Sequence, residues 1–162
     1  MSRLWQTEPS ARVPRMSTPT SHAAWTLRCD GGSRGNPGPA ALGYVLCDPS
    51  GAEIEAEGIF IGSATNNVAE YRSLISGLEA AIRFEVRELI VRMDSELVVR
   101  QMLGQYKVKN EGLKPLHADA RAASARLGRV RYEAVPRDDN GRADGLVNEA
   151  LDRALRRSES PR

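Results

Sequence analysis

The chain has 162 residues, of which 41% are hydrophobic and 27% charged, enough for one domain with a core of its own. Its formal charge of +2 is nearly balanced, so overall charge does not by itself indicate a nucleic-acid-binding protein. No run of about 18 apolar residues occurs, and the first residues lack the apolar stretch of a signal peptide, so we expect a cytoplasmic protein without a membrane segment.

The N-terminal segment, residues 1–22, is rich in Ser, Thr, Pro and Arg and shows no hydrophobic period, which predicts disorder. Apolar and polar residues then alternate over residues 24–30, which predicts a strand that ends at Asp30. After a loop rich in Gly and Pro, residues 41–47 and 53–61 predict two more strands. Because the links between these strands are short, they indicate an antiparallel meander.

The hydrophobic period then becomes helical. Apolar side chains recur at helical spacing from Tyr71 to Ile82, with Thr65 or Asn66 as the cap of the helix. The short apolar run at residues 89–94 predicts a buried strand that ends in an acid.

The remaining chain predicts three helices, a fifth strand and a frayed tail. In chain order these are helices at 96–103 and 113–127, a strand at 130–135, a helix at 143–155 and the tail at 158–162. The order β-β-β-α-β-α-α-β-α predicts an α/β protein with one five-stranded mixed sheet and helices on both faces. We expect residues 23–157 to form this single domain.

The two cysteines, Cys29 and Cys47, fit no zinc-site spacing. Both fall in predicted strands, so two alternatives are open: a cross-strand disulfide, or two reduced thiols in the core. We favour the reduced thiols, because disulfides are rare in cytosolic proteins.

Four carboxylates fall where the predicted topology can bring them together. Asp30 and Asp94 end strands, Glu70 lies in the first turns of a helix, and Asp144 lies near the start of the last helix. Each acid alone has an ordinary structural explanation, such as a turn or a helix start. The ends of adjacent parallel strands meet at one rim, however, and a hard divalent cation relieves repulsion between clustered carboxylates. Together the acids predict a Mg²⁺ or Mn²⁺ site, and two such ions can support an in-line displacement reaction at phosphorus.

Four motifs occur in chain order: CDGGSRGNPGPAALGYVL, ATNNVAEYRSLISGLEAA, IVRMDSELVVRQM and VPRDDNGRADGLVNEAL. Together they resemble the type 1 ribonuclease H family over residues 24–152. The resemblance implies the ribonuclease H-like fold and an endonuclease that hydrolyses the RNA strand of RNA–DNA hybrids. It also implies 5′-phosphate and 3′-hydroxyl products, little sequence preference, and two Mg²⁺ ions for which Mn²⁺ can substitute.

The resemblance also assigns site residues. The expected metal ligands, which are also catalytic, are Asp30, Glu70, Asp94 and Asp144. The expected substrate contacts are Gly31, Gly32, Asn36, Thr65, Asn66, Asn67 and Ser95. The glycines would let an RNA backbone approach closely, and the amides would bind the backbone and the 2′-hydroxyls that distinguish RNA from DNA. A helix-capping role is open for Ser95 as well.

The chain departs from the family pattern in the loop before the last helix, where many members have a histidine. Arg137 stands nearest to that place, whereas His22 lies in the N-terminal segment and His117 lies near an apolar helical stripe, where a surface or packing role is expected. Arginine stays protonated and cannot act as a general base. Our hypothesis is that Arg137 acts in catalysis by steadying the scissile or departing phosphate.

A second departure is that the short stretch GQYKVKNEGLKP replaces the basic handle of some members, so the resemblance is to a handle-less enzyme. Two explanations are open for the C-terminal RALRR segment. Its arginines could bind the hybrid electrostatically in place of the missing handle, or they could belong to a solvated helix end, where they favour the helix dipole.

Two other function classes are a non-catalytic binding module that kept the fold and another enzyme on this fold, such as an integrase or a resolvase-like nuclease. The presence of all four acids argues against the binding module. The TNNVAE segment and the loop after Asp30 argue against the other enzymes. We expect a monomer whose partner is an RNA–DNA hybrid.

Overall fold

The computed structural model describes residues 23–159, so the disorder predicted for residues 1–22 lies outside the described residues. The centre of the fold is a five-stranded sheet with the strand order β4-β3-β2-β5-β6. Its strands are β2 (Trp25–Ser33), β3 (Gly38–Cys47), β4 (Glu53–Ala64), β5 (Glu88–Met93) and β6 (Arg129–Ala134). Strands β2, β3 and β4 pair antiparallel, whereas β5 runs parallel to both β2 and β6. The predicted mixed sheet is therefore confirmed.

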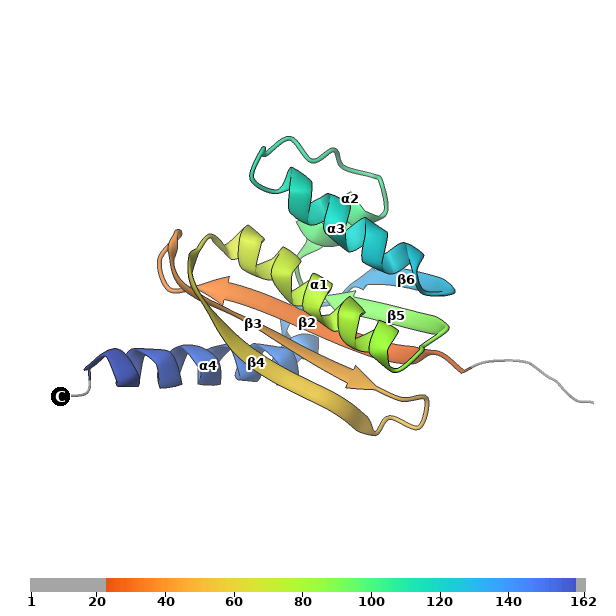
Figure 1. Ribbon diagram of the computed structural model, residues 1–162, viewed down its shortest axis with the longest axis horizontal. Helices are drawn as coiled ribbons and strands as arrows, with labels where there is room; N and C mark the ends of the chain where they lie inside the picture. Colours follow the sequence, from red (N-terminus) through yellow and green to blue (C-terminus); the bar gives the residue numbers. More distant parts are fainter. Residues whose placement is uncertain (1–22, 160–162) are drawn as a thin grey trace, which may run out of the picture.

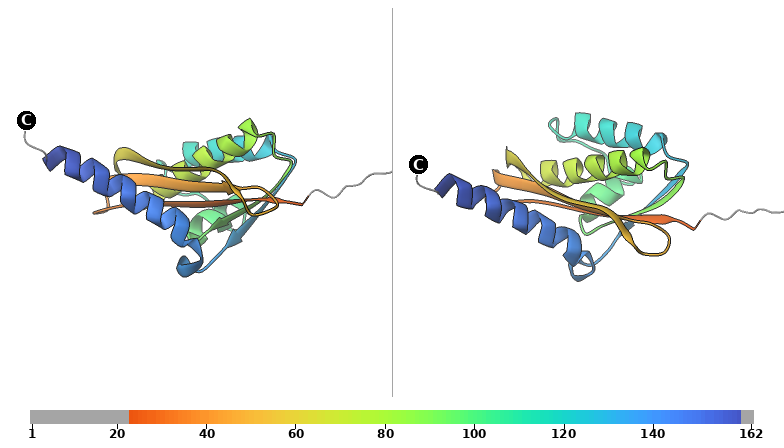
Figure 2. Two further views of the ribbon diagram at one scale, coloured as in Figure 1. Left: turned by 90° about the horizontal axis from the view of Figure 1, so that it is seen from below. Right: turned by 60° about the horizontal axis from the view of Figure 1, so that its bottom comes forward.

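Helices cover both faces of this sheet, as predicted. They are α1 (Asn66–Arg83), α2 (Glu96–Met102), α3 (Lys114–Ala125) and α4 (Gly141–Glu159), with a short 3₁₀ helix η3 (Arg137–Asn140) before α4. Helices α1 and α3 lie on one face and α4 on the other, where its C-terminal end projects past the strands (Figures 1 and 2). The larger apolar core joins the sheet to α1, α2 and α3, and a smaller cluster lies under α4.

Strand β2 is longer than predicted, and the expectation that it ends at Asp30 was wrong. Its parallel pairing with β5 stops at Cys29 opposite Met93, but its antiparallel pairing with β3 continues to Ser33 opposite Ala40. Gly31 and Gly32 are therefore strand residues, held in extended form by the ladder to β3. Asp30 lies where β2 runs on without its parallel neighbour.

Side-chain caps fix the starts of α1 and α2. Of the two predicted caps of α1, Thr65 is the one present: its Oγ1 accepts a hydrogen bond from the Val68 amide at 3.2 Å. Ser95 caps α2 in the same way, through the Val98 amide at 3.3 Å. At the other end of the chain, α4 continues to Glu159, two residues into the segment predicted to be frayed.

The cysteines and His117 have packing roles. Both cysteines are free thiols, as favoured, but only Cys29 is in the core, because Cys47 ends its strand half-buried. The His117 and Tyr71 rings pack in a T-shaped contact, and His117 Nε2 lies 3.2 Å from the Gln101 carbonyl oxygen. Of the surface and packing roles expected for His117, these contacts support packing.

Within residues 23–159, none of the helices combines the length and apolar character needed to cross a membrane.

Candidate active site

Two of the four predicted acids are neighbours because of strand register. Cys29 of β2 lies opposite Met93 of β5 in the last pair of the parallel ladder, so the next residues, Asp30 within β2 and Asp94 just after β5, lie side by side. Asp30 is buried, with 7% of its surface exposed, and Asp94 is half-buried. The sequence-based placement of these acids at one rim is confirmed.

Glu70 reaches the same place from α1. The Gly31 amide donates a hydrogen bond to Glu70 Oε1 at 3.0 Å, which ties the helix to β2 beside Asp30. A Cβ atom at Gly31 would lie 2.3 Å from both the carbonyl carbon and the oxygen of Ala69. Glycine at position 31 is therefore required by the approach of α1. Gly31 also lines the cleft, and its expected contact with RNA stays a prediction. Gly32 has no such crowding and lines the cleft beside the acids.

Helix α4 brings Asp144 to the opposite side of Asp30 by lying against two paired glycines. Gly43 of β3 lies opposite both Asp30 of β2 and Gly58 of β4. A Cβ atom would lie 2.7 Å from the Ala143 oxygen at Gly43 and 2.4 Å from the Leu146 oxygen at Gly58. The missing side chains let the backbone of α4 rest on the sheet, which places Asp144 next to Asp30.

The four acids line one cleft of about 400 Å³. Carboxylate oxygens of Asp30, Glu70 and Asp94 all lie within 4.8 Å of one another. Burial is the main cause that raises the pKa of Asp30 to about 8, followed by the negative charge of Asp94 and a hydrogen bond with Asp144. Burial, and then the charges of Asp30 and Asp94, also raises the pKa of Glu70 well above its usual range. The negative charge of the ionised cluster is thus poorly compensated by other groups of the protein.

This arrangement fits a divalent cation. All the clustered groups offer carboxylate oxygen, which Mg²⁺ and Mn²⁺ prefer, and no cysteine or histidine lines the cleft among the described residues. A cation would also relieve the repulsion that raises the two pKa values. Asp30, Glu70 and Asp94 could therefore hold a metal ion directly, with Asp144 beside Asp30 available for the same ion or a second one.

Asn140 is a site residue that the sequence interpretation missed. Its Nδ2 donates hydrogen bonds to the Cys29 carbonyl oxygen at 2.8 Å and to Asp94 Oδ1 at 2.9 Å, and the residue is 1% exposed. Both partners are acceptors, so the amide must face them with its nitrogen. Asn140 thus fixes one oxygen of Asp94 and joins η3 to β2. Its only signal in the sequence was its place in the last motif.

The β2–β3 loop and the start of α1 are held together by amides that were predicted to contact substrate. Asn36 Oδ1 accepts from the Asn66 amide at 3.0 Å, and Asn66 Oδ1 accepts from the Ser33 amide at 2.8 Å. Their side-chain oxygens are therefore used within the protein, while Asn36, Asn66 and Asn67 are all exposed. The hydroxyls of Thr65 and Ser95 accept the capping bonds of α1 and α2.

Arg137 lines the cleft from η3. Its positive charge lowers the pKa of Glu70, although less than burial and the two neighbouring acids raise it. The structure therefore brings Arg137 to the acids, as the sequence predicted.

Comparisons with known proteins agree with this geometry. The fold and the site define an α/β protein with a carboxylate cluster at the carboxyl end of its parallel strands. The family model described as "Reverse transcriptase-like" matches residues 28–150. Halobacterium salinarum has a relative named ribonuclease HI, 45% identical over 125 residues, which cover 77% of this chain and 63% of the relative. The chain belongs to this family, whose domain is ribonuclease H-like.

Solved structures extend the likeness. The N-terminal RNase H domain of Rv2228c from Mycobacterium tuberculosis superposes with a TM-score of 0.80 at 44% identity, over 84% of this chain and 99% of that one. LC11-RNase H1, solved in complex with an RNA/DNA hybrid, gives a TM-score of 0.77 at 45% identity, over 81% and 99% of the two chains. The chain nevertheless spans only 35% of the length of the full mycobacterial protein, which is named a bifunctional protein and is 49% identical over 129 residues.

Proposed function

We propose that this protein is an endonuclease that hydrolyses the RNA strand of RNA–DNA hybrids, leaving 5′-phosphate and 3′-hydroxyl ends. The observation that carries the proposal is the convergence of Asp30, Glu70, Asp94 and Asp144 in one cleft, on a fold shared with ribonucleases H. Residues 23–157 form its catalytic domain. Cleavage with little sequence preference follows from a cleft that offers backbone contacts, because phosphate and sugar contacts carry no base information directly.

In this proposal the four acids bind two Mg²⁺ ions, and Mn²⁺ substitutes for them. Bound cations would supply a water nucleophile at neutral pH and stabilise charge on the leaving oxygen. The acids of this chain hold their oxygens in place for that chemistry: Gly31 donates to Glu70, and Asn140 donates to Asp94. In this proposal the RNA backbone and its 2′-hydroxyls are contacted by Gly31, Gly32, the exposed amides of Asn36, Asn66 and Asn67, and the capping residues Thr65 and Ser95.

Arg137 has the role of steadying the scissile or departing phosphate, because it is a permanent cation at the edge of the acid cluster. Changing Arg137 to Ala should lower kcat about tenfold and leave measurable cleavage, since the metal ligands remain. Unchanged kcat across the pH range would contradict this role.

The test of the function is cleavage of an end-labelled RNA–DNA hybrid beside single-stranded RNA, double-stranded RNA and duplex DNA. We expect cutting of the hybrid's RNA strand with Mg²⁺ or Mn²⁺ and none with chelator. Binding of the hybrid without cutting under any metal condition would favour a non-catalytic binding module. We further infer a monomeric, cytoplasmic protein, and light scattering of the purified chain tests the oligomeric state.

A further inference from the structure

The cleft that holds the four acids also holds Arg34, an arginine to which the proposed mechanism has given no role. Among the described residues that line the cleft, the cations are Arg137 and Arg34, and the lining also includes Asn148 and Leu151 of α4. A nucleic-acid strand that crosses four carboxylates is repelled unless cations compensate its phosphates. Both arginines line the same cleft as the acids, where such compensation is needed.

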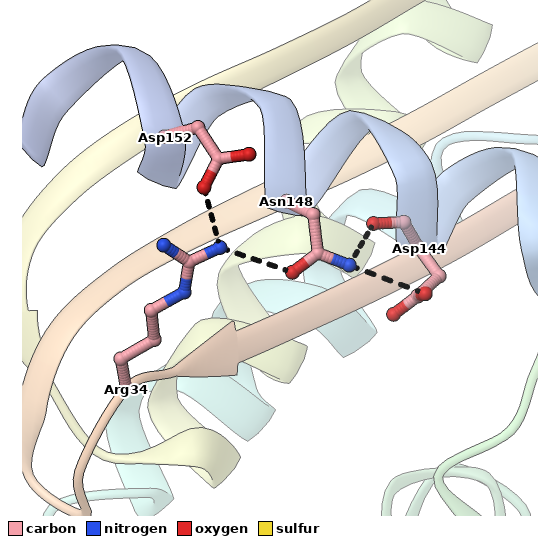
Figure 3. A network of polar contacts seen from close by, with 4 residues as sticks. All are labelled: Arg34, Asp144, Asn148 and Asp152. Atoms are coloured by element: carbon pink, nitrogen blue, oxygen red, sulfur yellow. Dashed lines mark hydrogen bonds and ion pairs between the residues drawn. The ribbon is translucent and has the colours of Figure 1, made fainter. Parts of the chain in front are cut away.

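Arg34 is held at present by a carboxylate of its own chain. Its Nη2 lies 2.9 Å from Asp152 Oδ1 and 3.4 Å from Asn148 Oδ1, and Asn148 Nδ2 in turn donates to Asp144 Oδ2 at 3.3 Å (Figure 3). A single side chain, Asn148, therefore connects the guanidinium group to the predicted metal ligand Asp144, on the surface of α4 that faces the cleft. Carboxylate and phosphate oxygens suit the planar donors of arginine equally well.

The ion pair between Arg34 and Asp152 is easily exchanged. The two side chains are 41% and 50% exposed, and such pairs contribute little to stability in water. The loop that carries Arg34 does not depend on the pair, because the Arg34 amide donates to the Pro39 carbonyl oxygen at 2.8 Å and Asn66 binds the Ser33 amide. The Arg34 side chain is thus free to change partner without moving the loop.

From these contacts we propose that Arg34 is a substrate-binding residue that leaves Asp152 to bind a phosphate of the RNA strand beside the cleavage site. This assignment rests on the proposed function, since it needs the RNA strand to lie over the acids. The eight residues from Asp144 to Asp152 advance about 12 Å along α4, more than the rise of one nucleotide, so the phosphate is a flanking one and not the scissile one.

Two variants separate phosphate binding from a merely structural ion pair. With a short fluorescent RNA–DNA hybrid in chelator, Arg34→Gln should raise Kd about tenfold and reduce the slope of log Kd against log salt by about one. Asp152→Asn breaks the same ion pair but frees Arg34, so Kd should stay unchanged or fall. If both variants raise Kd equally, or if Arg34→Gln leaves Kd unchanged, the proposal is overturned.

Neutralising one phosphate of the hybrid at a time identifies the strand that Arg34 contacts. Methylphosphonate linkages placed one at a time along the RNA strand should, at one flanking position, weaken wild-type binding and leave Arg34→Gln binding unaffected. Coupling found only with linkages in the DNA strand, or with none, would overturn the assignment. These binding measurements are independent of cleavage, so a wild-type protein that fails to cut would refute the proposed function and leave the Arg34 result interpretable.

Discussion

Asn140 shows how one buried amide supports a carboxylate. It uses both hydrogens of Nδ2, one on the backbone of Cys29 and one on Asp94. A hydrogen bond to a charged group contributes about 1.5–3 kcal/mol, and an unpaired buried partner costs a similar amount. Asn140 therefore keeps Asp94 pointing toward Asp30 and Glu70 before any cation arrives.

Changing Asn140 to Asp keeps the shape of the side chain but replaces both donors with acceptors. We expect kcat to fall more than tenfold at an unchanged KM for the hybrid, and Mn²⁺ affinity measured by calorimetry to fall, because Asp94 loses its support. Changing Asn140 to Ala should have a smaller effect, since it removes the donors without adding repulsion.

Val86→Ala is the matched control, because it opens a cavity in the core at a residue remote from the cleft lining. It should lower the melting temperature and leave kcat and Mn²⁺ affinity near the wild-type values. An Asn140→Asp protein that binds Mn²⁺ as wild type does would show that Asn140 has only a structural role.

The four acids could be identified from the sequence, whereas Asn140 could not. The acids follow apolar runs or begin helices, and they fall within motifs that resemble a known family. Asn140 is in no periodic segment, and its two partners are 111 and 46 residues away in the chain. Only the folding of η3 onto β2 brings them together.

At the scale of elements, the close packing of α4 on the sheet determines where Asp144 lies. The contact depends on the cross-strand pair Gly43 and Gly58, beside Asp30 in the same row of the sheet. The sequence predicted α4 and its apolar face, but not which glycines it covers, because that depends on strand register. Strand β2 was mispredicted at its end for a related reason: its glycines suggested a loop, and pairing with β3 overrides that local preference.

Changing Gly58 to Ala should therefore disturb both stability and activity. The added Cβ would meet the Leu146 backbone oxygen at 2.4 Å, and α4 must shift to make room. We expect a loss of about 1–3 kcal/mol in the free energy of unfolding, from denaturant titration, together with reduced hybrid cleavage because Asp144 moves from Asp30.

Gly145→Ala is the control for this prediction, since a Cβ atom there has no neighbour within 4 Å and the residue lies inside α4. It should be stabilising by about 0.5–1 kcal/mol because alanine favours the helix. A Gly58→Ala protein as stable and active as wild type would contradict the close-packing argument.

At the scale of the whole molecule, the acid cluster makes the metal-free protein sensitive to alkaline pH. Asp30 has its pKa raised to about 8, from an ordinary 3.8, by burial, Asp94 and Asp144. The folded state therefore holds a proton that the unfolded state has already lost over this interval, so stability falls as pH rises from about 4 to about 8. Glu70 adds to the effect in the same direction, while Arg137 opposes it.

In chelator, the melting temperature should fall from about pH 5 to about pH 9, and Mg²⁺ should reduce that fall. Asp30→Asn should flatten the profile, since it removes the ionising group while leaving the neighbouring acids. An identical fall in the variant, or in wild type saturated with Mg²⁺, would show that other groups control the pH dependence.

The order of elements and the sheet were predictable because hydrophobic period and link length constrain them strongly. The alternating runs and short links required a meander, and the helical crossovers required parallel strands beside it. The interior of the cleft was not predictable to the same depth, because the contacts of Arg34, Asn140 and the glycines under α4 join segments far apart in the chain.

The most direct test of the whole account is the rate at which Asp94→Asn cuts the RNA strand of a hybrid at saturating Mg²⁺. The amide oxygen can still accept the hydrogen bond from Asn140, so the fold and hybrid binding should survive, while loss of the charged metal ligand should lower the rate at least about a hundredfold. Cleavage by a folded Asp94→Asn protein at a rate near that of wild type would contradict the assignment of the carboxylate cluster as the metal-binding active site.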